Sequence, residues 1–257
     1  MEQLSKILFY DTEFVGMVKF FSDLTKQQQE ACLFQWRKDK EFVKEEEEHL
    51  ILLNLHEQTD PSIFYEKYWS IKAGLTEFTR IICFSFGWVE DGKLKIKSYN
   101  TLNFDEEGYN VLDFNCTTEL SSKIKAVMSR KDKFDALCAH SLDADLKSIT
   151  RDFIQDGLEL PYLVKECMNA TPWQYNSFKG KAYCTNKLSH KLYGKHLRLK
   201  DLCTILNVKS SKDQLDGSLI HQTFWNGKQK EIENITKYCE EDVKAMFNCF
   251  KKLRFYI

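Results

Sequence analysis

Three stretches rich in carboxylates lie far apart in the chain and could together bind metal ions. They are Asp11–Glu13, His140–Asp145 and Tyr238–Asp242. Carboxylates that gather within about 4 to 6 Å repel one another and take up protons, so a cluster that stays ionised at neutral pH requires divalent cations. If the fold brings the three stretches together, the sequence predicts a site for two metal ions.

In the first stretch, Asp11 and Glu13 follow the apolar run Lys6–Tyr10, which is typical of a strand buried on both faces. We expect this strand to end at Asp11. Residues two apart on a strand point the same way, so both carboxylates could share one ion. The alternative is a pair of acids in an exposed loop. An unpaired charge beside a core strand is costly, and this favours the metal site.

The second stretch offers two candidate carboxylates, and helical spacing separates them. Asp145 lies in the apolar stripe of the predicted helix Leu142–Gln155, whereas Asp143 lies on the basic side of that helix. We expect Asp145 to point inward, and Ser141 or Asp143 to cap the helix. His140 could contact a substrate, or it could be a capping or core histidine.

In the third stretch, Tyr238 and Asp242 are four apart on the predicted helix Ile232–Leu253. This spacing stacks the phenol and the carboxylate on one face, so both could reach the same centre, whereas Glu240 and Glu241 lie off that face. A core tyrosine beside a surface aspartate is the alternative for this stretch taken alone.

The three stretches resemble the motifs of the DEDD superfamily of 3′-to-5′ exonucleases, in its tyrosine-bearing branch. The matching segments are Phe9–Phe14, Ala139–Asp145 and Tyr238–Val243. Further segments resemble the bacterial and phage group related to the exonuclease domain of family B DNA polymerases: Ala73–Ile81, Leu199–Leu206, Lys212 and Asp216–Ser218. The similarity covers roughly residues 5–14 and 73–250 and leaves residues 17–72 uncovered.

The resemblance implies a ribonuclease H-like fold that hydrolyses terminal phosphodiesters of single-stranded nucleic acid, with DNA favoured. Two cations, Mg²⁺ or Mn²⁺, would assist the reaction. The metal ligands that it implies are Asp11, Glu13, Asp145 and Asp242. Tyr238 would hold the attacking water by a hydrogen bond. It would not deprotonate that water, because a phenol with a pKa of about 10 is a poor general base. The implied contacts to nucleic acid are Thr12, Phe14, His140, Ser141 and Lys212.

Two positions depart from the family pattern, which usually has Asn where Ser141 stands and an aromatic residue where Ala144 stands. They prompt a second hypothesis, a nucleic-acid-binding or assembly subunit on the same fold with weakened catalysis. A third hypothesis is a carboxylate-pair hydrolase such as a glycosidase, which needs two acids and no metal.

The remaining segments predict an α/β fold. Residues 80–89 and 93–99 form the clearest hairpin, with Asp91–Gly92 in the turn, and Phe134–Ala139 is typical of a parallel strand. Further predicted helices are Leu120–Met128 and Leu199–Leu206. We expect a mixed five-stranded sheet, with three antiparallel strands and then parallel strands, flanked by helices.

The chain length suits one exonuclease domain over residues 1–257, in which residues 17–72 form a mainly helical insertion after the first strand. The nine cysteines include no C-x-x-C pair, which argues against a structural zinc site and a disulfide scaffold. No apolar run suits a signal peptide or a membrane span, so we expect a cytoplasmic protein without a membrane partner.

A net charge of −1 gives no global basic signature, so a polyanion must bind a local patch. Residues 179–212 hold nine Lys or Arg against one acid, Asp201, with Tyr183 and Tyr193 interleaved. This composition suits a single nucleic-acid strand, and a solvated loop and helix is the alternative. Replication or repair proteins are further candidate partners. The sequence leaves open the choice of DNA or RNA, a proofreading role and the oligomeric state.

Overall fold

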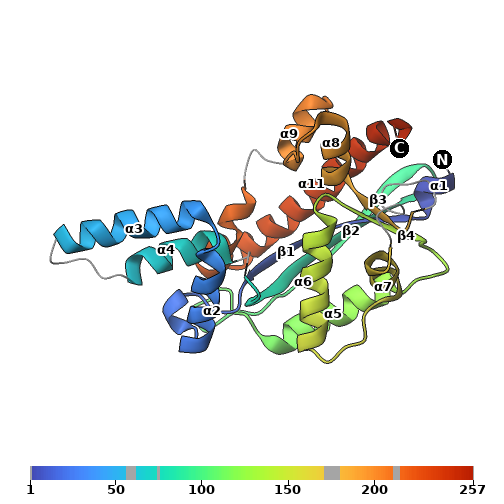
Figure 1. Cartoon of the computed structure of the whole chain (residues 1–257). Coiled ribbons are helices and arrows are strands. Elements are labelled where there is room, and N and C mark those ends of the chain that lie inside the picture. Colours follow the sequence, from blue (N-terminus) through green and yellow to red (C-terminus); the bar gives the residue numbers. More distant parts are fainter. Residues whose placement is uncertain (1, 56–61, 74–75, 171–179, 211–214, 257) are drawn as a thin grey trace.

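The computed structural model describes residues 2–55, 62–73, 76–170, 180–210 and 215–256 (Figure 1). Five strands form one mixed sheet in the order β3-β2-β1-β4-β5. Their bounds are β1 (Ile7–Gly16), β2 (Thr79–Glu90), β3 (Lys93–Asn100), β4 (Ala136–Ala139) and β5 (Ala182–Cys184). The first three strands pair antiparallel, whereas β4 runs parallel to β1 and β5 parallel to β4. The predicted mixed five-stranded sheet is therefore confirmed, and β5 forms where we predicted no strand.

The predicted hairpin also forms. Asp91 and Gly92 have φ angles of 51° and 73°, so both turn residues are left-handed. Two such residues give the tight turn whose twist matches that of the flanking strands. Along β3, exposed and partly buried residues alternate from Lys93, as expected for a strand at the edge of a sheet.

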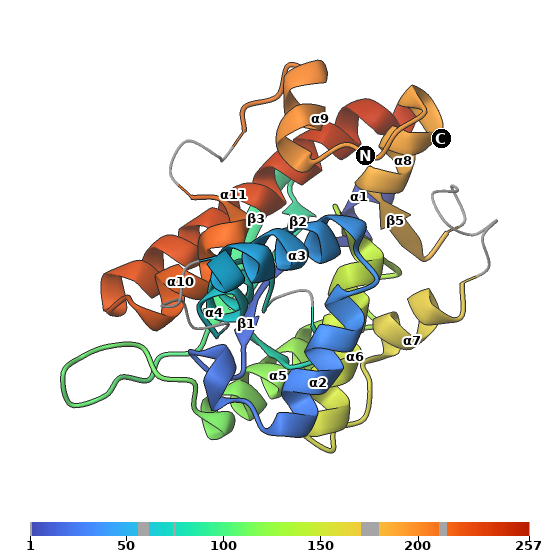
Figure 2. The same ribbon diagram turned by 60° about the vertical axis from the view of Figure 1, so that its left-hand side comes forward.

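Helices cover both faces of this sheet (Figures 1 and 2). The long helix α11 (Gln229–Leu253) crosses one face and contacts β1, β2 and β3. Around it lie α8 (Thr185–Tyr193), α9 (Leu199–Ile205) and α10 (Ile220–Trp225). The other face carries α5 (Phe114–Met128), α6 (Leu142–Gln155) and α7 (Tyr162–Met168). Short helical turns complete the chain: α1 (Glu2–Ser5), η3 (Gly217–Leu219) and η4 (Arg254–Tyr256).

Alternation along β1 decides which of its side chains meet which layer. Phe9 packs edge-on against Phe247 and Phe250 of α11, at ring-centroid distances of 5.1 and 5.6 Å. Because successive side chains point to opposite faces, Asp11 and Glu13 share the face of Phe9. Tyr10 and Thr12 point to the layer that contains α6.

Residues 17–72 are mainly helical, as predicted, over the part that the structure describes. They form η1 (Phe21–Asp23), α2 (Lys26–Trp36), α3 (Lys40–Leu55) and α4 (Ser62–Lys72), and Figure 1 shows α3 and α4 projecting away from the sheet. Trp36, Phe42 and Trp69 lie in a core of their own within this segment. Trp69 also contacts the ring of His221 in α10, so the insertion is attached beside the end of β1.

The expected end of the first strand at Asp11 is wrong, since β1 continues to Gly16. The apolar run marks only the residues buried between two neighbouring strands. Pairing with β4 stops at Phe9, but the antiparallel ladder with β2 goes on to the pair of Gly16 with Thr79. Asp11 and Glu13 therefore lie within a strand and are held by a regular ladder.

Two further findings concern membrane-spanning helices and the cysteines. In the described part of the chain, no helix has both the length and the apolar character that crossing a membrane requires. All nine cysteines are free thiols, and eight of them are buried.

Candidate metal centre

The first acidic stretch is placed by the pairing of β1 with β2. Asp11 lies opposite Ser85 and Glu13 opposite Cys83, and the register shifts between Glu13 and Phe14. Because Phe14 pairs with Ile81, β2 carries one extra residue directly beside Glu13. A bulge of this kind bends the strand and re-aims nearby side chains, and bulges are enriched next to active sites.

Cys239 lies beside the two carboxylates of β1. Ligand atoms of Asp11, Glu13 and Cys239 all lie within 4.8 Å of one another, and Cys239 comes from α11. The Cys239 thiol donates a hydrogen bond to the Asp11 carbonyl oxygen, at 3.4 Å. This bond fixes α11 against β1 at the acidic pair.

Sequence analysis did not single out Cys239. The signal that could have found it is the helical spacing, because Cys239 is three residues before Asp242 and therefore on the same side of α11.

Asp145 reaches the same region from α6, on the other side of the sheet. Its Oδ1 accepts a hydrogen bond of 2.8 Å from the Thr12 hydroxyl. The Asp145 side chain can reach β1 at this point because β4 does not pair with β1 beyond Phe9. Asp145 is buried while Asp143 is exposed and lies 2.7 Å from Lys187, so the prediction that Asp145 points inward is confirmed.

The third stretch contributes a hydrogen-bonded pair. Tyr238 and Asp242 are both buried on α11, and a hydrogen bond links the phenol to the Asp242 carboxylate. The phenol pKa is raised above its ordinary value by burial, then by the charges of Asp242 and Glu13. Tyr238 therefore stays protonated at neutral pH and serves as a hydrogen-bond donor.

Electrostatic coupling shows that the three stretches meet. The pKa of Asp11 is raised well above its ordinary value by burial, then by the charges of Asp242 and Asp145. The pKa of Glu13 is raised in the same way, by burial first and then by Asp11 and Asp242. Burial raises the pKa of Asp145 to about 7, against the lowering effect of the hydrogen bond from Thr12. The fold thus concentrates four carboxylates that repel one another.

These residues fit a site for hard divalent cations. Asp11 Oδ2 and Asp145 Oδ2 are buried, and neither has a hydrogen-bond partner among the described residues. Carboxylate oxygens are the ligands that Mg²⁺ and Mn²⁺ prefer, and a cation would offset both the cost of burying these charges and the repulsion between them. Burial raises the pKa of the Cys239 thiol well above its ordinary value, so it stays protonated and is a poor ligand beside them.

One further element borders the site. The turn η3 follows Asp216, whose carboxylate accepts a hydrogen bond of 2.9 Å from the Ser218 amide. A Cβ atom added at Gly217 would lie 3.8 Å from the Tyr238 hydroxyl. Since Gly217 is exposed, the phenol lies close to the molecular surface at this turn.

The residues predicted to contact nucleic acid fall into different environments. Thr12 is buried against Asp145, and Phe14 packs against the main core. Nδ1 of His140 bonds to the Thr185 hydroxyl at 2.8 Å, and Nε2 bonds to the Leu197 carbonyl at 3.0 Å. Both ring nitrogens of His140 are therefore engaged within the protein, which favours the structural alternative for this residue.

The two remaining residues predicted to contact nucleic acid are Ser141, at the start of α6, and Lys212. Ser141 is the exposed N-cap of α6 and makes no side-chain capping bond. Its backbone carbonyl accepts from the Asp145 amide at 3.2 Å. Lys212 lies outside the described residues.

The basic segment 179–212 is partly neutralised. Lys187 pairs with Asp143 at 2.7 Å and Arg198 with Asp201 at 2.9 Å, whereas Lys191, Lys195 and Lys200 are exposed. Lys179 lies outside the described residues. The patch is thus reduced to its exposed lysines on and around α8 and α9.

Sequence comparisons assign no relative to this chain: no protein-family model matches it, and neither does any curated protein. The residues of the site and their geometry are therefore the basis for assigning a function.

Proposed function

We propose that this chain is a metal-dependent 3′-to-5′ exonuclease of the tyrosine-bearing DEDD type, on a ribonuclease H-like fold. Its substrate would be single-stranded nucleic acid, with DNA favoured. The observation that supports this most strongly is the meeting of three remote acidic stretches, in which burial, and then the charges of Asp242 and Asp145, raise the pKa of Asp11. A purely structural role would not require four mutually repelling carboxylates beside buried oxygens without partners.

The chemistry follows from the donor set. Two divalent cations, when bound, would neutralise charge on the scissile phosphate and acidify a water molecule. Asp11 and Glu13 would hold the cations from β1, and Asp242 from α11. Asp145 would orient the second cation, and Thr12 keeps Asp145 in position through its hydrogen bond.

Tyr238 would act on the water rather than on the metal. Because its phenol remains protonated, it is not a general base. Its single O–H is donated to Asp242 and fixes the ring, so the phenol oxygen could accept a hydrogen bond from an attacking water and orient it toward the phosphate. The turn at Gly217, next to this hydroxyl, is where we place the entry of the strand end.

The proposal is tested with the purified chain and a 5′-labelled single-stranded DNA oligomer in Mn²⁺. We expect a ladder of products shortened from the 3′ end, and no products when EDTA removes the cation. A 3′-terminal phosphorothioate should slow the ladder. The absence of any shortening at saturating Mn²⁺ would reject the exonuclease and favour the binding or assembly subunit. Cleavage of glycosides in EDTA would instead support the metal-free hydrolase.

Parallel assays on matched DNA and RNA oligomers would decide the preferred sugar. Cytoplasmic location and a link to replication or repair proteins remain part of the proposal.

A further inference from the structure

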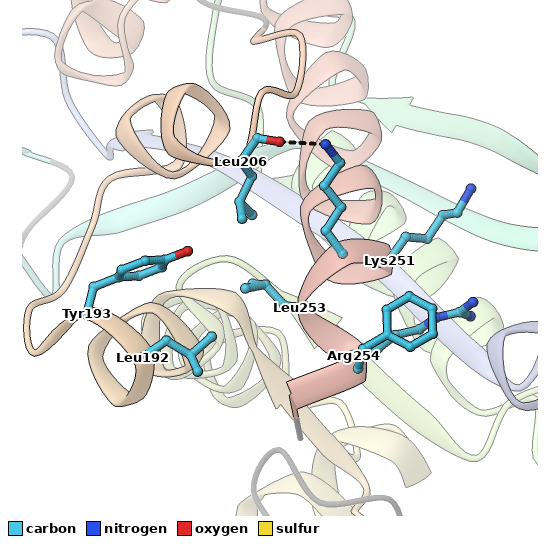
Figure 3. A pocket seen from close by; sticks show the side chains of 8 residues that line it. Leu192, Tyr193, Leu206, Lys251, Leu253 and Arg254 are labelled. Carbon is cyan, nitrogen blue, oxygen red and sulfur yellow. Dashed lines mark hydrogen bonds between the residues drawn. The ribbon is translucent and has the colours of Figure 1, made fainter.

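A groove lies at the C-terminal end of α11, where α8 and α9 pack against it (Figure 3). Its volume is about 780 Å³. Leu192 and Tyr193 of α8 line one side, and Lys251 and Arg254 lie on the opposite side of Leu253. The groove lies outside the acidic cluster, which consists of Asp11, Glu13, Asp145 and Asp242. It shares no lining residue with that cluster.

The described charges of the groove are all positive. Lys251, Lys252 and Arg254 line it, and no acid is among the lining residues that the structure describes. Lys252 Nζ donates hydrogen bonds to the carbonyl oxygens of Leu206 at 2.6 Å and Asn207 at 3.4 Å, so this cation fixes the end of α9 to α11. Lys251 and Arg254 are the lining cations that could meet an anionic ligand.

Exposed rings accompany these cations. Phe255 is 75% exposed and Tyr193 is 42% exposed. Arg254 lies over the Phe255 ring, 4.9 Å from its centroid, and Lys251 lies 5.5 Å from the centroid of Phe247. Flat aromatic faces beside Lys or Arg are the combination that binds single strands, because bases stack on the rings while phosphates meet the cations. An acidic peptide would use the cations but leave the ring faces without a partner.

We propose that this groove binds single-stranded nucleic acid, as a second contact for the strand whose 3′ end lies at the acidic cluster. The inference rests on the proposed function for the course of the strand. Lys251 is nine residues after Asp242 on α11, which corresponds to about 14 Å along the helix axis. The groove therefore meets the strand upstream of its terminal nucleotides.

The test measures binding by fluorescence anisotropy in EDTA, so that hydrolysis cannot interfere. The long probe is a labelled oligothymidylate of about 20 nucleotides. For the double variant Lys251→Ala/Arg254→Ala, the slope of log affinity against log salt should fall by about 1.4 with this probe. Phe255→Ala should weaken binding of the same probe by about 5- to 160-fold.

The matched control is Arg130→Ala/Lys131→Ala, which removes the same two residue types from an exposed segment after α5, on the other face of the sheet. It should leave affinity and salt slope unchanged. Wild-type affinity and slope in the groove variants, or an equal loss in the control, would overturn the inference. A change in sedimentation without a change in binding would also overturn it, because a second copy of the chain would then be the occupant.

The two proposals fail separately. If the wild-type protein binds the long probe through the groove but does not shorten DNA in Mn²⁺, the exonuclease is rejected and the groove stands. If it shortens DNA and the groove variants bind normally, only the groove is rejected.

Discussion

Asp143 and Asp145 are two residues apart on α6, yet their surroundings differ. Asp143 is exposed and pairs with Lys187, whereas Asp145 is buried and accepts the Thr12 hydroxyl. A buried carboxylate with an unpartnered oxygen is suited to a cation, and an exposed ion pair contributes little to stability or chemistry. The helical position of each acid thus separates a candidate ligand from a surface residue.

The first prediction uses this contrast. Asp145→Asn should lower the rate of single-strand shortening in Mn²⁺ by about 100-fold or more, because it removes a charge that would hold a cation. Asp143→Asn should stay within about twofold of wild type. Initial rates and circular dichroism on both variants provide the measurement. Equal rates for the two folded variants would contradict the assignment of Asp145.

The second prediction concerns pH and metal. The pKa of Asp145 is raised to about 7, and the pKa values of Asp11 and Glu13 are also raised. Without metal, ionising these groups costs more in the folded state than in the unfolded state. Their contribution to stability is therefore most favourable at acid pH and is lost as the pH rises through the folded pKa of Asp145.

Divalent cations should reverse this trend, since a cation binds the ionised carboxylates. The increase in thermal midpoint caused by Mn²⁺ should accordingly be larger above pH 7 than below it. Scanning fluorimetry across this pH range measures both effects. A Mn²⁺-induced increase that does not depend on pH would show that these carboxylates do not bind the ion.

At the scale of elements, the end of β1 joins the sheet, the insertion and α10. The Gly16 amide donates to His221 Nδ1 at 3.1 Å, and the Gly16 carbonyl accepts from the Trp225 indole at 3.3 Å. A Cβ atom at Gly16 would lie 2.5 Å from the Trp69 ring. Trp69 is fully buried, and its ring also contacts Phe21 and Trp36, so a shift of the ring would disturb the core of the insertion.

The third prediction follows from this close packing. Gly16→Ala should lower the free energy of unfolding by about 1 to 3 kcal/mol through overpacking. Gly217→Ala is the matched control, because its added Cβ meets nothing closer than the Tyr238 hydroxyl at 3.8 Å. Urea denaturation should show a lower midpoint for Gly16→Ala alone. A wild-type midpoint for Gly16→Ala would mean that the insertion is not packed against β1 as described.

Several elements could be predicted because their signal is local. Helix α6 has the predicted bounds Leu142–Gln155, since its apolar stripe is regular. The β2–β3 turn follows from Asp91–Gly92, which accept left-handed angles. The strand β5 was missed because its three residues carry too short a pattern, and β1 was cut short because its ladder with β2 continues past the apolar run.

At the scale of the whole molecule, one buried cation connects the sheet to the helices behind it. Arg80 of β2 is 1% exposed and pairs with Asp156 at 2.6 Å. It also donates a hydrogen bond to the Thr117 hydroxyl of α5 at 2.9 Å. Asp152 of α6 is equally buried, and burial raises its pKa to about 6 against the lowering effects of the Ile81 amide and Arg80. Sequence analysis placed Arg80 in the second strand but did not find this network, because its members are far apart in the chain.

The fourth prediction is that Arg80→Ala lowers the free energy of unfolding by about 3 to 5 kcal/mol, since it leaves the buried Asp156 carboxylate without its cation and leaves Asp152 only Arg151, at 3.6 Å. Arg130→Ala is the control: Arg130 is exposed and pairs with Asp132, and such pairs contribute about 0 to 1 kcal/mol. Chemical denaturation measures both changes. Similar values for the two variants would contradict the role assigned to Arg80.

The candidate site itself is a property of the whole molecule. Motif spacing predicted that Asp145 would point inward and that Asp242 would share a helix face with Tyr238, and both acids are buried. It could not predict that both ring nitrogens of His140 are engaged, or that the Cys239 thiol contacts the Asp11 carbonyl, because those contacts join segments distant in sequence. Side-chain direction within a helix is local information, whereas the partner across the sheet depends on the complete fold.

The central claim is that the acids of the three stretches converge to bind divalent cations. It is tested most directly by anomalous diffraction from crystals grown with Mn²⁺. We predict anomalous peaks within coordination distance of the Asp11 and Glu13 carboxylates, with Asp242 as a further ligand. A map without a peak at these carboxylates, at saturating Mn²⁺, would contradict the account.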